Sequence, residues 1–578
     1  MIGLLAWAWV FTLPGLVLTA LGVPGGQKRA GFASIPGPIV MLVIGLAALA
    51  SGSTATVQFD NWLPFLPDGA FRALADPLSA LMLVILGFVA TLVYIYSLGY
   101  MADDPGRRRF FVYLDLFVAT MALLVLAGNL AVLLIGWTGV GISSFLLISF
   151  WRDRPGTLSA GLQALAANAI GDGALLLAAS IVPSGCGALV TLHTPQCTGG
   201  PGGAEFLALL LFVAAAAKSA QGPLYFWLPN AMAGPTPISA LIHAATMVAA
   251  GVYLLVRGHA LLALAPQVSL AIAVIGVATA LGASLASLYQ TNFKKGIAYS
   301  TVAQLGYMFA GVGVGAPFAG LFHLFTHASF KALLFLAAGI VIHGAGGRES
   351  LSALRGLGRF FPFSRVGFLI GSLALIGTPL VTAGSFSKDA IIDAAIAKQP
   401  IIGWLLLAGV ILTGLYIGRL FSIVYLAPPV DVHAVHHDAE SERPMNWSLV
   451  PLMVGAIAFG WLGSWLQATL APPLGEIEAL PPPTDPRGLL AFALGAVGFG
   501  LAWWYFTRSA EAVAMAPGQP VVEGEPTYRA AGWVSVLADA GYAVARSLSR
   551  VQSGGLPRYA MGSFIGLALI LLVREAIR

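Results

Sequence analysis

The chain of 578 residues is 58% hydrophobic and 9% charged, and its mean hydropathy is +0.87. Because soluble domains carry roughly 25% charged residues, this composition excludes a chain that folds in water. The formal net charge of +5 gives no indication of a nucleic acid partner, and the positions of the basic residues say more than their sum.

Apolar runs of about 20 residues, the length that spans a hydrocarbon core of roughly 30 Å, recur along the whole chain. Lipid cannot satisfy open backbone groups, and the runs lack the alternation of a membrane barrel, so each run should be a helix. The sequence predicts an all-α polytopic membrane protein with about sixteen transmembrane helices. Their approximate starts are residues 3, 32, 77, 110, 129, 159, 204, 234, 267, 298, 317, 361, 401, 447, 487 and 557. No A-x-A-like cleavage site follows the first, so we expect residues 3–22 to be retained.

Basic residues gather in alternate loops, which by the positive-inside rule should be cytoplasmic in a bacterial inner membrane. These residues are Lys28 and Arg29, Arg107 to Arg109, Arg152 and Arg154, Lys294 and Lys295, and Arg348, Arg355 and Arg359. The loop with Cys186 and Cys197 then lies on the periplasmic side. A disulfide there is optional, because the spacing of two cysteines does not decide their pairing.

Three connections are longer than the rest: 184–203, 427–446 and 508–556. Within the last, Tyr528 to Arg550 has apolar residues at helical spacing, which predicts an amphipathic helix lying along the membrane. Such a helix can equally pack on its own bundle or contact a partner.

A weak internal repeat pairs Lys218 in AAAAKSAQGP with Lys388 in TPLVTAGSFSKD. Gly, Ser and Pro interrupt both apolar spans, which predicts helices broken near the middle of the membrane. Transporters built from inverted repeats place ion sites at such breaks, where unwound backbone supplies ligands.

Ionisable side chains inside apolar spans cost several kcal/mol unless they find partners or water, so each needs a reason. The candidates are Asp172, Lys218, His243, His323, His327, Lys331, Lys388 and Asp389. A packing role is the alternative for each, and for Asp115, near the start of its helix, we favour that alternative.

His323, His327 and Lys331 are four residues apart and therefore share one helical face. Imidazole and a desolvated lysine both suit stepwise proton transfer, so the pattern indicates a proton wire. Two histidines at this spacing also fit zinc, but the glutamate of H-E-x-x-H and a third ligand are missing. We therefore expect no metal site, and we interpret His433, His436 and His437 as a solvated loop surface.

No dinucleotide-binding glycine turn, iron–sulfur cysteine cluster or haem motif is visible, so the chain itself should carry no electrons. Several long segments of the sequence nevertheless resemble one known protein family. They are FFVYLDLFVATMALLVLAGNL, GWTGVGISSFLLISFW, AKSAQGPLYFWLPNAMAGPTPISALIHAATMVAAGVYLL, AYSTVAQLGYMF and LFHLFTHASFKALLFLAAG. Over residues 75–425 the chain resembles the antiporter-like, proton-conducting subunit family (subunit L) of bacterial NADH:quinone oxidoreductase, respiratory complex I, related to multisubunit Na⁺/H⁺ antiporters.

The resemblance implies two inverted five-helix repeats that form two half-channels joined by a polar axis. Lys218 would serve the first half and His243 the bridge, Lys331 and its histidines would follow, and Lys388 would be the exit. Thr138, Lys294 and Asn230 are possible supporting residues. The implied divisions are N-terminal helices (1–109), first half-channel (110–258), second half-channel (259–426), peripheral helices (427–507), lateral segment (508–556) and C-terminal anchor (557–578). NADH, FMN, iron–sulfur clusters and quinone would bind partner subunits of the complex and not this chain.

Three positions depart from the family pattern. Thr138 stands where GWTGVG would have glutamate, Ala169 where an arginine would precede Asp172, and Asn230 where WLPNAMAG would have aspartate. Loss of the glutamate together with the arginine removes a neutral pair, so we expect Asp172 to act as the counter-ion of Lys218.

Several alternatives stay open on the sequence alone. The chain can belong to a cation/proton antiporter or an inorganic-carbon uptake complex, or it can be a structural subunit whose first half-channel is silent. The 508–556 segment favours complex I, because a lateral helix needs neighbouring membrane subunits.

Overall fold

The computed structural model describes residues 2–508, except 24, 27, 28, 61, 63–69, 184, 430–442, 476, 478 and 483. The predicted lateral segment beyond Arg508, the C-terminal anchor and the loop with His433, His436 and His437 therefore lie outside the described residues.

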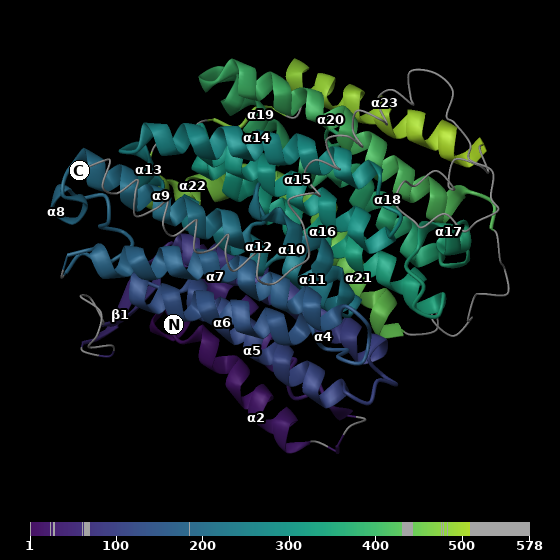
Figure 1. Ribbon diagram of the computed structural model, residues 1–578, viewed down its shortest axis with the longest axis horizontal. Coiled ribbons are helices and arrows are strands. Elements are labelled where there is room, and N and C mark those ends of the chain that lie inside the picture. The colour runs from purple at the N-terminus through teal and green to yellow at the C-terminus, as the bar shows by residue number, and fades with distance from the viewer. Residues whose placement is uncertain are drawn as a thin grey trace.

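The described part is a bundle of long helices lying side by side (Figure 1). Its N-terminal portion contains α1 (Ile2–Leu5), η1 (Ala8–Thr12), α2 (Leu13–Leu21), α3 (Pro36–Ser51), β1 (Ala55–Phe59), β2 (Phe71–Ala75), α4 (Pro77–Tyr100), α5 (Arg107–Val125), α6 (Leu130–Ile148), α7 (Thr157–Ile181), α8 (Pro195–Thr198), α9 (Pro201–Lys218), η3 (Leu224–Phe226), α10 (Trp227–Asn230), η4 (Ala231–Ala233), α11 (Thr236–Ala244), α12 (Met247–Arg257) and α13 (His259–Ala263). Its C-terminal portion contains α14 (Pro266–Leu288), α15 (Phe293–Gly313), α16 (Pro317–Gly344), α17 (Leu351–Leu354), η5 (Leu357–Phe360), α18 (Pro362–Ile376), α19 (Ala383–Lys398), α20 (Pro400–Phe421), the π-helical η6 (Ser422–Leu426), α21 (Arg443–Ala458), η9 (Phe459–Leu462), α22 (Gly463–Leu474) and α23 (Pro486–Arg508).

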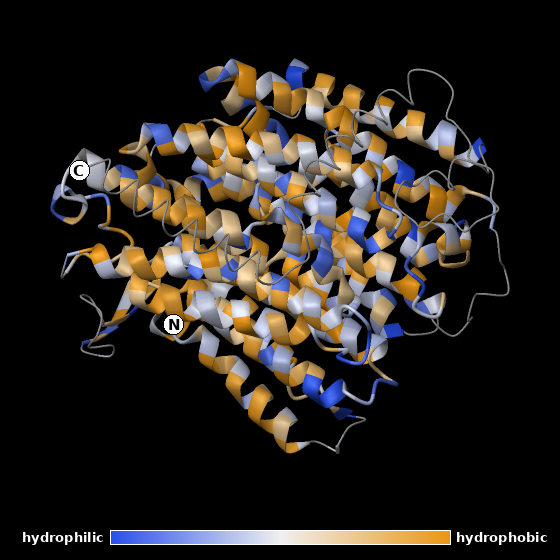
Figure 2. Cartoon of the chain, viewed as in Figure 1, coloured by the Kyte–Doolittle hydropathy of each residue, from blue (hydrophilic) through white to orange (hydrophobic). Residues whose placement is uncertain are grey.

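Within the described ranges, nine helices are long and apolar enough to cross a membrane, or ten if the pair bent by 110° at Phe361 is one span. Figure 2 shows hydrophobic residues over most of the helices, with hydrophilic residues interspersed. A mostly helical membrane protein is thus confirmed, whereas the number sixteen and the inverted repeats stay predictions.

A short antiparallel hairpin precedes α4, and the sequence patterns did not predict it. β1 pairs with β2 in a register that places Ala55 opposite Ala75 and Phe59 opposite Phe71. The ring of Trp7 stacks on Phe71 at a centroid distance of 6.1 Å. Each strand is only five residues long, too short for its alternation to stand out beside helical spans.

Helix breaks occur close to both lysines of the weak repeat, as predicted. α9 ends at Lys218, and α18 and α19 are separated by residues 377–382. A third break, at residues 245 and 246, separates α11 from α12. Ala220 and Leu380 have positive φ angles of 50° and 60°, a conformation that L-residues seldom adopt, so tertiary packing must hold the breaks.

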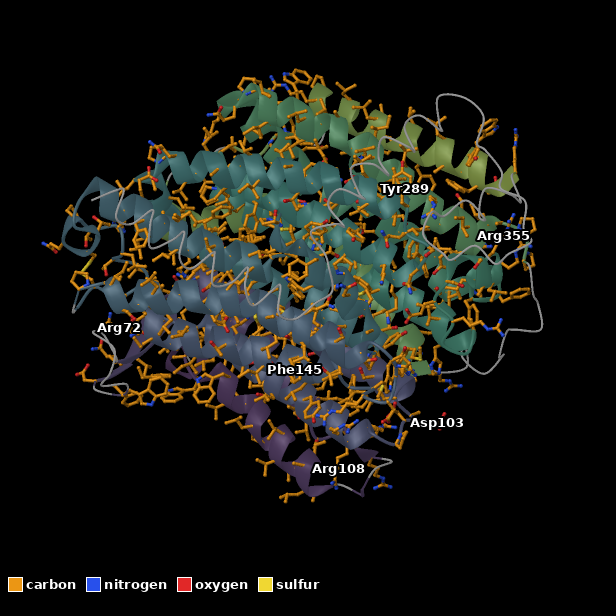
Figure 3. All side chains as sticks on the ribbon, in the orientation of Figure 1. Arg72, Asp103, Arg108, Phe145, Tyr289 and Arg355 are labelled. Carbon is orange, nitrogen blue, oxygen red and sulfur yellow. A yellow bond between two sulfur atoms is a disulfide. The ribbon has the colours of Figure 1, made fainter. Side chains whose placement is uncertain are left out.

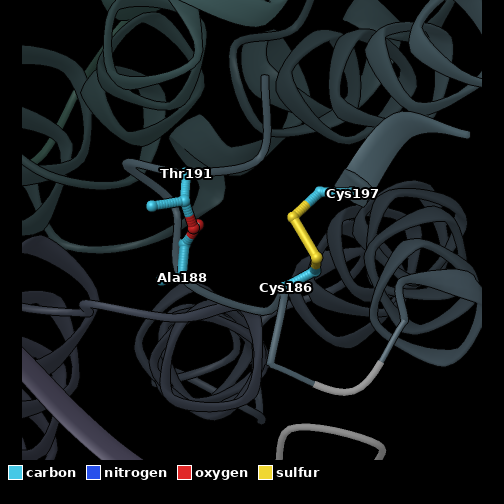
Figure 4. The surroundings of a disulfide bond; sticks show 4 residues. All are labelled: Cys186, Ala188, Thr191 and Cys197. Carbon is cyan, nitrogen blue, oxygen red and sulfur yellow. A yellow bond between two sulfur atoms is a disulfide. The ribbon is translucent and has the colours of Figure 1, made fainter. Parts of the chain in front are cut away.

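The two ends of the bundle differ in charge. Figure 3 places Arg355 and Asp103 toward one end of the long helices and Arg72 toward the other. The first end, here called the basic end, contains Arg107 to Arg109, Arg152, Arg154, Lys294, Lys295, Arg348, Arg355 and Arg359. The other, the disulfide end, contains the bond between Cys186 and Cys197 in the connection from α7 to α9 (Figure 4).

Small residues allow α14 and α15 to approach closely. A Cβ atom added at Gly306 would lie 2.5 Å from the Gly276 carbonyl oxygen and 2.7 Å from the Ala280 nitrogen. Both neighbours are backbone atoms and cannot turn away. Close backbone approach at small residues is a general way to associate helices where lipid gives no hydrophobic driving force.

We therefore expect Gly306→Leu to destabilise the protein by at least about 1 to 3 kcal/mol, the usual range for overpacking a core. Gly282→Leu on α14 is the matched control, because a Cβ there meets nothing within 4 Å. Thermal unfolding of the detergent-solubilised protein, followed by size-exclusion chromatography, measures both. Equal melting temperatures for the two variants would contradict the tight α14–α15 contact.

Candidate functional site

Six of the predicted site residues are almost completely buried. Lys218, His243, His323, His327, Lys331 and Lys388 each have at most 1% of their surface exposed. They come from α9, α11, α16 and α19 and lie close to helix breaks or on the central helix α16. Such burial of basic groups demands polar partners, and the structure shows which partners each group has.

Lys218 faces Asp172 across the contact between α9 and α7. The Nζ atom lies 3.9 Å from the nearer carboxylate oxygen, and the side chains are 0% and 20% exposed. This distance is within ion-pair range and well inside the roughly 8 Å limit for a direct charge effect. Asp172 also hydrogen-bonds the Thr138 side chain of α6. The geometry that the counter-ion hypothesis requires is therefore present.

The position of Lys218 at the end of its helix also favours a cation. Lys218 is the last residue of α9, where the helix dipole presents its negative end. Its Nζ atom lies 5.4 Å from the centre of the Trp137 ring. A Cβ added at Gly141 would lie 3.1 Å from that Nζ atom, so Gly141 leaves the room that the amine occupies.

His243 occupies the last turn of α11, next to the second break, and its ring lies 4.6 Å from the ring of Phe335 on α16. Both ring nitrogens of His243 and of His327 lack hydrogen-bond partners among the described residues. His243 interacts electrostatically with Lys331 and Lys294. It therefore lies close to the row of residues on α16.

His323, His327 and Lys331 follow one face of α16, as their spacing predicted. The rings of His323 and His327 are 6.1 Å apart. The Lys331 ammonium donates to the hydroxyl of Ser300 on α15, which in turn donates to the Ile297 carbonyl at 2.8 Å.

His323 is hydrogen-bonded on both sides of its ring. Nδ1 lies 2.9 Å from the Ser387 hydroxyl and Nε2 lies 3.0 Å from Gln304 Oε1. The Ser387 hydroxyl is also 2.6 Å from Thr326 Oγ1. Our sequence interpretation missed Ser387, Gln304 and Ser300. A signal existed in SFSKD and AYSTVAQLGYMF, where polar residues interrupt apolar runs.

Lys388 bonds to the broken backbone. Its ammonium donates to the Leu375 carbonyl and, at 3.4 Å, to the Ile376 carbonyl, the last two residues of α18. The break thus exposes carbonyls that a continuous helix would use internally. Ser387 precedes Lys388 directly, so α19 presents the His323 contact and the amine on adjacent residues.

Two of the supporting candidates lie away from this row. Lys294, in the first turn of α15 at the basic end, donates to the Gly234 carbonyl at 2.9 Å and to Glu349 at 2.8 Å. Asn230 donates to Gln163 at 2.8 Å. Neither contacts Lys218, but Lys294 interacts electrostatically with His243. Throughout the described ranges, no three or more His, Cys, Asp or Glu side chains are placed to share a metal ion.

Two family models match the chain. Residues 127–415 match the transmembrane family described as NADH:quinone oxidoreductase/Mrp antiporter, and residues 68–111 match the N-terminus of chain 5 of complex I. The larger match contains every candidate residue from Thr138 to Asp389.

Curated relatives agree. NADH-quinone oxidoreductase subunit L of Mycobacterium tuberculosis is 40% identical over 74% of this chain and 69% of its own length. The Escherichia coli K12 subunit L is 41% identical over 72% of this chain and 67% of its own length. NADH-ubiquinone oxidoreductase chain 5 of Cryptococcus neoformans is 40% identical over 71% of this chain and 63% of its own length.

A solved structure of the Mrp complex from Dietzia sp. DQ12-45-1b contains a chain that is 26% identical, with a TM-score of 0.76. The match covers 99% of this chain and 63% of that chain. This chain thus spans less than two thirds of the Mrp chain and of the Cryptococcus relative.

Removing one member of the Asp172–Lys218 pair should harm folding more than removing both. Asp172→Asn leaves the Lys218 amine buried without its counter-ion, whereas Asp172→Asn with Lys218→Met leaves no charge. We expect the single variant to be less stable than the double variant by on the order of 1 to 3 kcal/mol. This difference is smaller than for a fully buried pair, because the Asp172 side chain is 20% exposed and solvent weakens the interaction.

The amount and melting temperature of membrane-extracted protein measure this difference. Asp153→Asn, in the connection at the basic end, is the control for removal of a carboxylate, since its side chain is exposed. A double variant that is less stable than Asp172→Asn would contradict the hypothesis that Asp172 is the counter-ion of Lys218.

Proposed function

Because the chain belongs to the family of membrane subunits shared by NADH:quinone oxidoreductases and Mrp antiporters, we propose that it is a proton-translocating subunit of an NADH:quinone oxidoreductase. Partner subunits bind NADH, FMN, the iron–sulfur clusters and quinone, and this chain moves protons. The basic end faces the cytoplasm of a bacterial inner membrane, in keeping with the positive-inside rule.

One observation supports this proposal above all: a buried series of titratable side chains occurs in succession on α9, α11, α16 and α19, with Asp172 of α7 beside the first of them. His327 interacts electrostatically with Lys331, His323, His243 and Lys388, so it lies at the centre of the series. The ring nitrogens of His243 and His327 have no hydrogen-bond partner among the described residues, and buried polar atoms of this kind are usually satisfied by water.

The series can pass protons because its members influence one another's charge. A cation at Lys218 is stabilised by Asp172 as long as the 3.9 Å contact holds. Weakening that contact lowers the proton affinity of the amine, and the proton can then pass toward His243. Charge on Lys331 disfavours charge on His327 in the same way. Each proton therefore displaces the next toward Lys388.

The first half-channel is proposed to conduct without a glutamate at position 138. Asp172 supplies the carboxylate from α7, and Thr138 supplies a hydrogen bond to it. In this proposal residues 110–258 form the first half-channel and residues 259–426 form the second.

A second candidate function is cation/proton exchange in an Mrp-like complex. It is favoured by the likeness to a chain of the Mrp complex over 99% of this chain. The two functions differ in the partner subunits, which purification of the native assembly from membranes identifies directly.

Lys388→Met should abolish most pumping. The variant removes the amine that the α18 carbonyls hold, and loss of a positioned proton carrier usually costs a factor of about 10² to 10⁴. We expect the rate of NADH-driven proton uptake into sealed vesicles to fall at least about tenfold. Lys295→Met, at the basic end and outside the buried series, should pump like the unaltered complex.

The assembled amount of both variants is compared on native gels. Unchanged coupled pumping by a fully assembled Lys388→Met complex would overturn the exit role of Lys388.

His323→Ala and His327→Ala should each slow pumping without releasing zinc, if the α16 row is a wire. His323→Ala should have the larger effect on stability, because it also deprives Ser387 and Gln304 of a partner. His343→Ala, at the end of the same helix, is the control. Pumping rate and metal content of chelator-washed complex decide the matter, and one zinc per chain would contradict the wire.

A further inference from the structure

A cavity of about 560 Å³ opens beside α19, and its lining begins on that helix at Ala390, the residue after Asp389. It is bounded by the start of α16, the end of α19 and the start of α23. Its lining includes Gly315, Asp393, Ala394, Lys398, Leu480 and Arg487.

The cavity lies at the disulfide end. α15 begins at Phe293, whose backbone N–H donates to the Glu349 carbonyl at the basic end, and it runs to Gly313 at the opposite end. Gly315 follows directly, and its carbonyl accepts a 2.7 Å hydrogen bond from Lys398 at the end of α19. If the basic end is cytoplasmic, the cavity opens on the outer side.

Asp393 connects this cavity to the buried series. It lies four residues after Asp389 on α19, so both carboxylates extend from the same helical face. Asp393 is 19% exposed and lies 3.5 Å from Arg487, which is 52% exposed. Asp389 interacts electrostatically with Lys388 on one side and with Asp393 and Asp485 on the other.

The start of α23 is built to approach Asp389. A Cβ added at Gly488 would lie 2.6 Å from the Asp389 Oδ2 atom, so only glycine leaves room for that oxygen without a shift. Gly488 is in the first turn of α23, where the positive end of the helix dipole favours a carboxylate. Asp485 accepts from the Arg487 backbone N–H at 2.9 Å and so is engaged in the turn that begins α23.

We propose that Asp389 and Asp393 form the release relay of this subunit, and that Asp393 delivers the proton to water in the cavity at the disulfide end. The inference rests on the proposed function, since it needs a proton at Lys388. The Lys388 ammonium loses a proton to become a neutral amine, and the Asp389 carboxylate gains it. Asp389 passes it to the Asp393 carboxylate, which releases it to water and returns to its ionised form.

Arg487 has a positioning role in this relay. Its half-exposed guanidinium holds Asp393 at the cavity wall and favours the ionised form that accepts the next proton. An exposed pair of this kind is weak enough to open when Asp393 takes a proton.

The first test compares Asp393→Asn with Glu205→Gln in the complete complex. Both changes remove one carboxylate at the disulfide end, but only Asp393 lines the cavity one turn from Asp389. We expect Asp393→Asn to lower NADH-driven pumping roughly tenfold or more, Asp393→Glu to restore most of it, and Glu205→Gln to leave it unchanged. Electron transfer to an artificial acceptor that bypasses quinone should be equal in all three.

The second test locates the cavity. The chain contains two cysteines, and they are joined in the disulfide, so an introduced thiol is the only one in this subunit. Ala394→Cys, in the cavity wall, should react with a membrane-impermeant thiosulfonate from the disulfide side of sealed vesicles and then lose pumping. Ala395→Cys, fully buried and outside the lining, should not react. Mass spectrometry of this chain reads out the modification.

The outcomes of these tests distinguish a failure of the relay from a failure of the proposed proton-translocating role of Lys388. Normal pumping by Asp393→Asn while Lys388→Met is inactive overturns the relay and leaves the proposed function standing. Modification of Ala394→Cys from the basic side alone also overturns the relay. Normal pumping by both Asp393→Asn and Lys388→Met overturns the exit role of Lys388 on which the relay rests.

Discussion

The arrangement depends on one constraint: an ammonium group deep in an apolar bundle must be given an acceptor or a counter-ion. The three lysines of the buried series meet it in three ways. Lys218 has a carboxylate at 3.9 Å, Lys331 has a serine hydroxyl, and Lys388 has the free carbonyls at the end of α18. Full negative charge, a neutral dipole and a helix terminus stabilise a cation to different degrees, so the lysines cannot be equivalent proton carriers.

The broken helices follow from the same constraint. A continuous helix uses its carbonyls internally, and only an interrupted one can offer them to a side chain. Leu380, in the break between α18 and α19, has a φ of 60°, and Ala220, just after Lys218, has a φ of 50°. Close packing such as that between α14 and α15 gives the bundle the rigidity to hold these conformations.

Much of the site could be predicted from sequence, because an ionisable residue in an apolar run is conspicuous. The row on α16 followed from its spacing, and the breaks near Lys218 and Lys388 followed from Gly, Ser and Pro. The roles of these residues stay predictions.

The acceptors were not predicted, because the polar residues in SFSKD and AYSTVAQLGYMF mark the segments but not which side chain each residue bonds. Serine in a membrane helix usually bonds its own backbone, as Ser143 does to the Gly139 carbonyl at 2.7 Å, so its sequence does not reveal Ser300 or Ser387 as partners. Asp393 was missed for a different reason: near the end of a helix it resembles an ordinary surface carboxylate until the fold places Arg487 and the cavity beside it. The count of spans also stays open, because α3 has only 16 residues and the predicted C-terminal anchor lies outside the described residues.

The resemblance implies a glutamate at position 138, and with Thr138 there the constraint on Lys218 is met from another helix. A glutamate there would extend from α6, and the arginine expected at position 169 would balance it. With Thr138 and Ala169 in their places, the carboxylate beside Lys218 comes from Asp172 on α7, and the net charge of the group is still zero. Thr138 keeps a hydrogen bond in the same location, now directed to Asp172. A hydroxyl carries no full negative charge, so Thr138 cannot stabilise the protonated Lys218 amine as a carboxylate would. That stabilisation then depends on one contact, between Asp172 on α7 and Lys218 on α9. Any movement of α7 against α9 then changes the proton affinity of Lys218 directly, without a second carboxylate to compensate.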